Sequence, residues 1–172
     1  TDVIHSFWAP RLGGKLDMIP GRTNVLTVHA TEPGVSRAQC AEYCGGAHAL
    51  MSMFVVALEP AEYDAWLARE AAPATAPTSE AGREGRRLFL ENGCGACHTV
   101  RGTEANGAIG PDLTHVGGRL SLAAATLPND ARAFQRWLRD SHGVKPDNLM
   151  PPYDNLTDDE IAAIAAYLDG LE

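Results

Sequence analysis

The chain has 172 residues, and its hydrophobic content of 45% is ordinary for globular protein and leaves room for two small domains. Its formal net charge is −8, so a nucleic-acid partner has no electrostatic support. The longest apolar run, residues 47–58, is interrupted by His48 and Ser52 and is too short for a membrane-spanning helix. The chain opens without Met and without a signal-like segment, so we expect a processed or truncated product.

The first part of the chain, residues 1–70, predicts β-structure broken by turns that contain Gly and Pro. Residues 60–69 predict a short helix, because their aromatic and leucine side chains fall at helical spacing. Residues 71–79 carry no charge and no large apolar side chain, which predicts a linker between two domains. We expect four strands, rich in β-branched or alternating residues, at residues 2–8, 15–19, 24–30 and 51–58.

The second part of the chain, residues 80–172, predicts helices joined by loops. Residues 80–91 can form its first helix, and Asp130 can cap another. The run Thr157-Asp158-Asp159-Glu160 is a capping box that opens a final helix, which Gly170 stops. The sequence therefore predicts an all-β domain followed by an all-α domain.

The run Cys94-Gly95-Ala96-Cys97-His98 is typical of covalent c-type haem attachment. Residues three apart share one face of a helical turn, so Cys94 and Cys97 can both reach the vinyl groups at one porphyrin edge. His98 can then bind the iron. A zinc site would need a second ligand pair in the same domain, and thioredoxin-like chemistry would need a βαβ context.

A sixth iron ligand must come from elsewhere in this domain. Met150 is the only methionine after the linker, and Pro151 and Pro152 hold it in extended backbone. A thioether ligand raises the haem potential, which suits electron transfer between proteins. His115 and His142 are the competing candidates.

A second group of metal-binding side chains lies in residues 40–51. Two thiolates with three residues between them on a loop can bridge a pair of metal ions, and thiolate with thioether favours soft metals such as copper. Two ions need two imidazoles, so a histidine outside the loop is required; His5 is the candidate and His29 its rival. A disulfide is the structural alternative for the two cysteines. The loop supplies Cys40, Cys44, His48 and Met51.

The segment Gly110-Pro111-Asp112-Leu113, which follows the haem motif, resembles the glycine-proline turn of small monohaem cytochromes c. The resemblance covers residues 80–172. It implies that the carbonyl of Pro111 accepts the N–H of the proximal imidazole, the support that a metal-ligating histidine generally has.

The first half resembles the copper-A domain of subunit II of haem-copper cytochrome c oxidases, a cupredoxin-like fold. The resemblance implies a binuclear copper centre bridged by Cys40 and Cys44. It further implies that the carboxylate of Glu42 can reach a Mg or Mn ion at the interface with subunit I. The other implied ligands are His5 and His48 as terminal ligands, with Met51 and the Glu42 carbonyl as weak ones. The matching segments are residues 3–7, 13–15, 17, 19–22 and 40–51.

A copper-A domain followed by a fused class I cytochrome c resembles subunit II of the caa-type bacterial oxidases. The resemblance implies an electron-transfer subunit that passes electrons from a donor through haem c to copper-A and on to subunit I, where oxygen is reduced to water. The implied partners are subunit I and the other oxidase subunits, with a soluble or membrane cytochrome c or a quinol-linked complex as donor. We expect no catalytic acid, base or nucleophile in this chain.

Family members carry a transmembrane hairpin and further cupredoxin strands before the position of His5. We therefore expect an N-terminally truncated chain, an incomplete Greek-key barrel, and membrane association through the missing segment. The implied location is the periplasmic face of the bacterial inner membrane. Two alternatives stay open: the same centres in a nitric oxide or nitrous oxide reductase, and a first domain that delivers copper.

Overall fold

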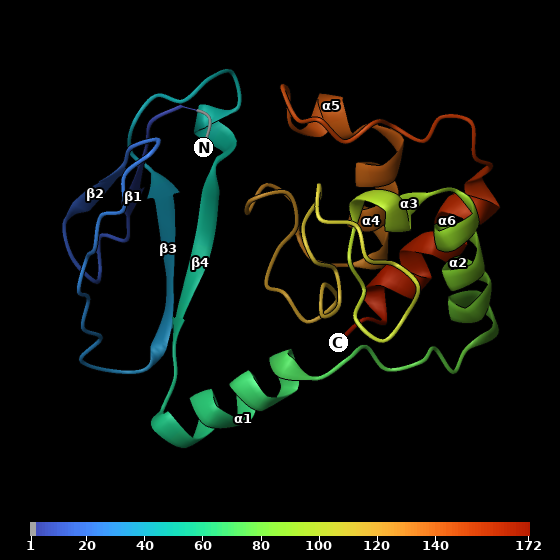
Figure 1. Cartoon of the computed structure of the whole chain (residues 1–172), viewed down its shortest axis with the longest axis horizontal. Helices are drawn as coiled ribbons and strands as arrows, with labels where there is room; N and C mark the ends of the chain where they lie inside the picture. The colour runs from blue at the N-terminus through green and yellow to red at the C-terminus, as the bar shows by residue number, and fades with distance from the viewer. Residues whose placement is uncertain (1–2) are drawn as a thin grey trace.

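The computed structural model describes residues 3–172 and consists of one β-sheet and a group of helices (Figure 1). Four strands form an antiparallel sheet in the order β2-β1-β3-β4. Three of the predicted strands are confirmed with shorter bounds; residue 2, part of the first, lies outside the described residues. The strands are β1 (His5–Trp8), β2 (Lys15–Met18), β3 (Gly34–Cys40) and β4 (Ser52–Ala57).

The strand predicted at 24–30 is wrong. Those residues form no strand, and Val25 is 84% exposed. The missing strand is β3, which follows them. Its inward positions are the small residues Ser36, Ala38 and Cys40, which give no hydrophobic alternation. The β-branched residues of 24–30, in contrast, have the composition typical of a strand.

Strand register sets the position of the loop that joins β3 to β4. β1 pairs with β3 at Phe7↔Cys40 and Trp8↔Gln39, so the start of β1 lies beside the end of β3. β3 pairs with β4 along its length, which brings the two ends of the loop together: the Cys40 N–H donates to the Met51 carbonyl at 2.9 Å. A short 3-10 helix, η1 (His48–Leu50), lies inside this loop.

The sheet is followed by helix α1 (Pro60–Ala71), which confirms the predicted short helix. Pro at its first position suits a helix start, because the N–H there has no intrahelical partner. Residues 72–79 then run along the helical half. The Ala74 N–H donates to the Arg101 carbonyl at 2.8 Å, and the Arg101 guanidinium donates to carbonyls at the end of α1 and in this segment.

The second half is helical, as predicted. Ser79 caps the first helix by accepting the Gly82 N–H at 3.0 Å, and Asp130 caps another in the same way. The predicted capping box of Thr157 and Glu160 is present. The helices are α2 (Glu80–Glu91), α3 (Cys94–Cys97), α4 (Ala131–Arg139), α5 (Ser141–Val144) and α6 (Asp158–Asp169).

Helices α2 and α6 cross closely and form the centre of the larger core. A Cβ on Gly85 would lie 1.9 Å from the Ala163 carbonyl oxygen, so only glycine permits this approach. Next to the crossing, the Phe89 and Tyr167 rings pack edge to face with centroids 5.6 Å apart. The buried apolar side chains of this half form one continuous cluster around that crossing.

The sheet and the helices lie side by side, and α1 crosses below them from β4 towards the segment that leads into α2 (Figure 1). Among residues 3–172, no helix combines the length and the apolar character that crossing a bilayer requires. The structure confirms the predicted order of an all-β half followed by an all-α half.

The close crossing yields a stability prediction. Gly85→Ala would press a methyl group against the backbone of α6, so we expect the free energy of unfolding of the helical half to fall by about 1–3 kcal/mol or more. Urea denaturation followed by circular dichroism measures this. Gly118→Ala is the control, because its Cβ would lie an ordinary 3.7 Å from the nearest atom. Equal stabilities of the two variants would contradict the close crossing.

Candidate functional site

Sulfur and imidazole groups gather at the end of the sheet where β1 and β3 meet. The Cys40 and Cys44 Sγ atoms lie 3.8 Å apart. The Nδ1 atom of His5 lies 3.9 Å from the Cys40 sulfur, and the Nδ1 atom of His48 lies 3.6 Å from the Cys44 sulfur. The strand pairing thus brings a histidine from the start of β1 to a loop 35 residues later.

Two weaker donors complete this cluster. The Met51 thioether sulfur lies 3.6 Å from the Cys44 sulfur, and the backbone carbonyl of Glu42 lies 3.2 Å from the Cys40 sulfur. The Glu42 carboxylate points elsewhere: it is exposed and accepts the Tyr43 N–H at 3.2 Å. The rival His29 is exposed on the 24–30 segment.

The chemistry of this donor set suits soft metal ions. Two thiols, two imidazoles, a thioether and a carbonyl converge, and the ligand atoms of His5, Cys40 and Cys44 all lie within 4.8 Å of one another. Thiolate and thioether sulfur favour copper over magnesium or calcium, and two neighbouring thiolates can be shared by two ions. The residues present therefore fit a pair of copper ions.

The second candidate site begins at α3, which places both cysteines of the C-x-x-C-H motif on one helical turn. The positive φ of +75° at Gly93 lets the chain turn from α2 into α3. His98 follows directly, and its Nδ1–H donates to the Pro111 carbonyl at 2.8 Å. This bond leaves Nε2 free to face a metal ion. Gly110 is required beside the ring, because a Cβ there would lie 2.5 Å from Cε1 of His98.

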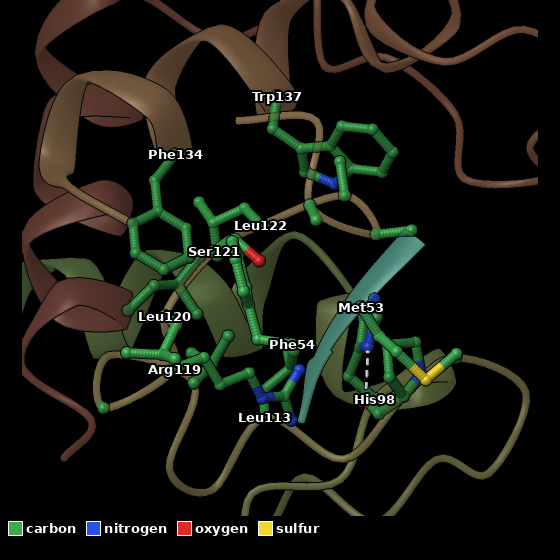
Figure 2. Close-up of a pocket in the computed structure, with 18 of the residues that line it drawn as sticks. Met53, Phe54, His98, Leu113, Arg119, Leu120, Ser121, Leu122, Phe134 and Trp137 are labelled. Atoms are coloured by element: carbon green, nitrogen blue, oxygen red, sulfur yellow. Dashed lines mark hydrogen bonds between the residues drawn. The ribbon is translucent and has the colours of Figure 1, made fainter. Parts of the chain in front are cut away.

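His98 and both motif cysteines line a cavity of about 1540 Å³. This volume exceeds the range of about 300–1,000 Å³ that small-molecule sites usually have, so the cavity has room for a large cofactor. Figure 2 shows Leu113, Phe134 and Trp137 around the cavity and Phe54 of β4 on its facing side. The apolar lining and the cysteine pair fit a covalently attached haem.

Met150 lines the same cavity and is held by three hydrogen bonds. Its N–H donates to the Asn148 side chain at 3.0 Å, and its carbonyl accepts the Ser141 hydroxyl at 2.8 Å. The Trp137 indole N–H lies 3.1 Å from its sulfur. The thioether is thus presented to the cavity by a fixed backbone.

The two competing histidines have other positions. His115 is 9% exposed, and its Nε2–H donates to the Ala72 carbonyl at 3.0 Å, which ties the segment after α1 to the helical half. His142 is exposed on α5. Among the described residues that line the cavity, Met150 is present and neither of these histidines is.

Comparison with known proteins assigns both halves. The sequence profile of the family named cytochrome c matches residues 82–172, more than half of the chain. The chain belongs to the cytochrome c family. A second profile, the periplasmic domain of cytochrome c oxidase subunit II, matches residues 1–58. The chain therefore joins a cupredoxin-like subunit II domain to a cytochrome c domain, a combination that implies copper and haem and an extracytoplasmic location.

Relatives share this order of domains along the whole chain. Cytochrome c oxidase subunit 2 of Alkalihalophilus pseudofirmus is 43% identical over 171 residues, covering 99% of this chain and 49% of that protein. The same subunit of Bacillus subtilis is 32% identical over 182 residues, covering 100% of this chain and 51% of that protein. The chain spans about half the length of these relatives. A crystal structure of the periplasmic domain of subunit II of the Bradyrhizobium japonicum cytochrome oxidase is 39% identical, covering 40% of this chain and 50% of that one with a TM-score of 0.39.

Sequence reasoning missed several contributions to the cytochrome c site. Trp137 lies in α4, the helix that Asp130 caps, and no local pattern shows that its indole reaches a sulfur 13 residues later. Met53 and Phe54 of β4 line the haem cavity, although they belong to the other half. Residues 53–57 of β4 are all apolar, and that run was a usable signal, because both faces of such a strand offer apolar side chains for contact.

The Cys40 thiol carries a pH prediction. Burial alone would raise its pKa, but hydrogen bonds with the Ser6 and Glu42 backbones and the His5 side chain outweigh burial and lower the pKa to about 6. In the copper-free protein we expect alkylation of Cys40 by iodoacetamide to be half-maximal at about pH 6, because the thiolate is the reactive form. Peptide mass mapping measures this.

His5→Phe is the informative variant for that measurement. It removes one of the hydrogen bonds to the thiolate and should move the alkylation midpoint to higher pH. A midpoint of the unaltered protein near that of an ordinary exposed cysteine would contradict the arrangement around Cys40.

Proposed function

We propose that the chain is the electron-transfer portion of subunit II of a respiratory terminal oxidase. In this function it takes electrons from a donor at haem c, transfers them to a binuclear copper-A centre and delivers them to subunit I, where oxygen is reduced to water. The observation that supports this most strongly is the convergence of two thiols, two imidazoles and a thioether within one chain that also carries a haem cavity.

The copper centre would be held mainly by the loop between β3 and β4. Cys40 and Cys44 would bridge the two ions, since their sulfurs lie 3.8 Å apart. The distances of the other donors to these sulfurs support their roles as terminal and weak ligands. Those donors are His5 and His48 as terminal ligands, and Met51 with the Glu42 carbonyl as weak ones.

The haem would be held by the helical half. Cys94 and Cys97 would form the thioether bonds, and His98 and Met150 would bind the iron. Pro111 would orient the His98 ring through the hydrogen bond to Nδ1. Trp137 would withdraw electron density from the Met150 sulfur by donating to it, which raises the haem potential.

When bound, the two cofactors supply one-electron redox chemistry. The protein's residues bind them, fix their ligands and exclude water. Catalytic acids, bases and nucleophiles are not required of this chain, because oxygen would be reduced in subunit I. The exposed Glu42 carboxylate would be available to a Mg ion at the subunit I interface.

The partners follow from this assignment. They would be subunit I and the other oxidase subunits, and a soluble or membrane cytochrome c or a quinol-linked complex as donor, at the periplasmic face of the bacterial inner membrane. The relatives that match the whole chain are oxidase subunits, so a nitric oxide or nitrous oxide reductase has no comparable support.

Electron paramagnetic resonance tests the copper centre. We expect the copper-loaded, oxidised protein to show a seven-line hyperfine pattern, because one unpaired electron is shared by two equivalent copper nuclei. Cys44→Ser removes a bridging thiolate and should abolish the pattern, whereas His29→Ala, at an exposed position, should keep it. A four-line mononuclear signal from the unaltered protein would exclude the binuclear site. A copper-delivery module would bind Cu(I) reversibly and show no mixed-valence signal.

A redox titration tests the axial ligand. Met150→His replaces a thioether by a stronger electron donor, so we expect the haem potential to fall by on the order of 100 mV or more, within the range of about 0.8 V that axial ligands span. Spectroelectrochemistry measures this. His142→Ala serves as the matched control and should leave the potential unchanged. If Met150→His also leaves it unchanged, Met150 is not the ligand.

A further inference from the structure

The two halves touch through backbone groups of the loop that carries the copper ligands. The Gly46 N–H donates to Oδ2 of Asp147 at 3.1 Å. The Ser52 N–H donates to the Ala124 carbonyl at 3.2 Å. The Thr126 hydroxyl lies 3.5 Å from the Leu50 carbonyl. All three contacts join residues 46–52 to two loops of the cytochrome half.

The loops on the cytochrome side have unusual backbone. Ala123, Ala124 and Ala125 have φ values of 51°, 59° and 61°, and Asp147 has a φ of 62°. Left-handed backbone is unfavourable for L-residues other than glycine, and three successive alanines rarely adopt it. Such a conformation persists where surrounding contacts determine it, and strained residues gather at functional sites. In this chain they lie where the two halves meet.

The contacts also lie next to the candidate ligands of both centres. Gly46 lies two residues from Cys44 and two from His48, and Asp147 lies three residues before Met150. One hydrogen bond therefore completes a short path of covalent bonds between the two ligand sets. Lys145 also shows that the two sites are close. It lines the cavity, and it lies near enough to Cys44 for an electrostatic interaction.

We propose that residues 123–126 and Asp147 form a docking clamp that holds the haem cavity against residues 46–52, next to the candidate copper ligands. This clamp sets the rate of electron transfer between the two centres. Asp147 is the positioning residue, acting through the Gly46 amide. This inference rests on the proposed function. In the step concerned, one electron leaves Fe(II), which becomes Fe(III), and the copper pair gains that electron; no bond forms or breaks. Electron tunnelling weakens exponentially with distance, so a small separation of the halves slows it strongly.

The decisive variant is Asp147→Gly in the full chain loaded with haem and copper. Glycine accepts a φ of 62°, so the change removes the carboxylate without adding backbone strain. We expect hydrogen exchange at the Gly46 amide to rise about tenfold, as loss of a hydrogen bond to a charged group implies. Exchange at Ser52 should rise with it, although its own partner is unchanged. The rate of intramolecular electron transfer after rapid haem reduction should fall several-fold.

Two further variants separate the clamp from a local effect. In Gly46→Ala a Cβ would lie 2.3 Å from Oδ2 of Asp147, so it should release the clamp in the unaltered background and have little effect when combined with Asp147→Gly. Asp154→Ala removes the same charge from an exposed position of the same half and should change neither exchange nor transfer rate.

The outcomes are distinguishable. If Asp147→Gly raises exchange only at Gly46 and leaves the transfer rate unchanged, while the haem potential and copper spectrum stay intact, the clamp is overturned and the proposed function stands. If the unaltered protein has no mixed-valence copper signal, the proposed function fails. In that case, a rise of hydrogen exchange at both Gly46 and Ser52 in Asp147→Gly would support docking of the halves. A rise at Gly46 alone would overturn it.

Discussion

The pairing of β1 with β3 is the constraint on which the copper-binding arrangement depends. Side chains alternate between the faces of a strand, so a shift of one residue in this short register would turn His5 away from Cys40. Among the described residues, Phe7↔Cys40 and Trp8↔Gln39 set this register, and the Ala41 N–H continues it by donating to the Ser6 carbonyl at 2.8 Å. The pairing of β3 with β4 then closes the loop so that Met51 returns beside the cysteines. The site is thus an outcome of strand geometry rather than of the loop alone.

The cytochrome half reaches its geometry by close packing. The α2–α6 crossing requires Gly85, and the His98 ring requires Gly110, because a methyl group at either position would overlap with atoms already there. The approach at Gly110 leaves room for the imidazole, whose Nδ1–H donates to the Pro111 carbonyl, and the side chains that line the cavity are mostly apolar. In the proposed function, such fixed side chains would limit rearrangement when the oxidation state of the haem changes.

The halves are less independent than a flexible linker would make them. The segment after α1 is tied to Arg101 and His115 by hydrogen bonds, and β4 of the sheet forms part of the wall of the haem cavity. The strained loops lie at the same boundary. Strained backbone and several candidate ligands therefore lie close to the boundary between the two halves.

Features that depend on local spacing can be predicted from the sequence. The C-x-x-C-H motif, the capping box of Thr157 and the order of an all-β and an all-α half are read from residues close together in the chain. Strand β3 was not predicted, because its inward residues are small and give no hydrophobic alternation. Residues 24–30 have the composition of a strand but pair with no strand of the described sheet. The contacts of His5 with Cys40, Trp137 with Met150 and Asp147 with Gly46 became visible in the three-dimensional structure alone. Such meetings depend on strand register and packing between distant segments, which no local pattern of residues encodes.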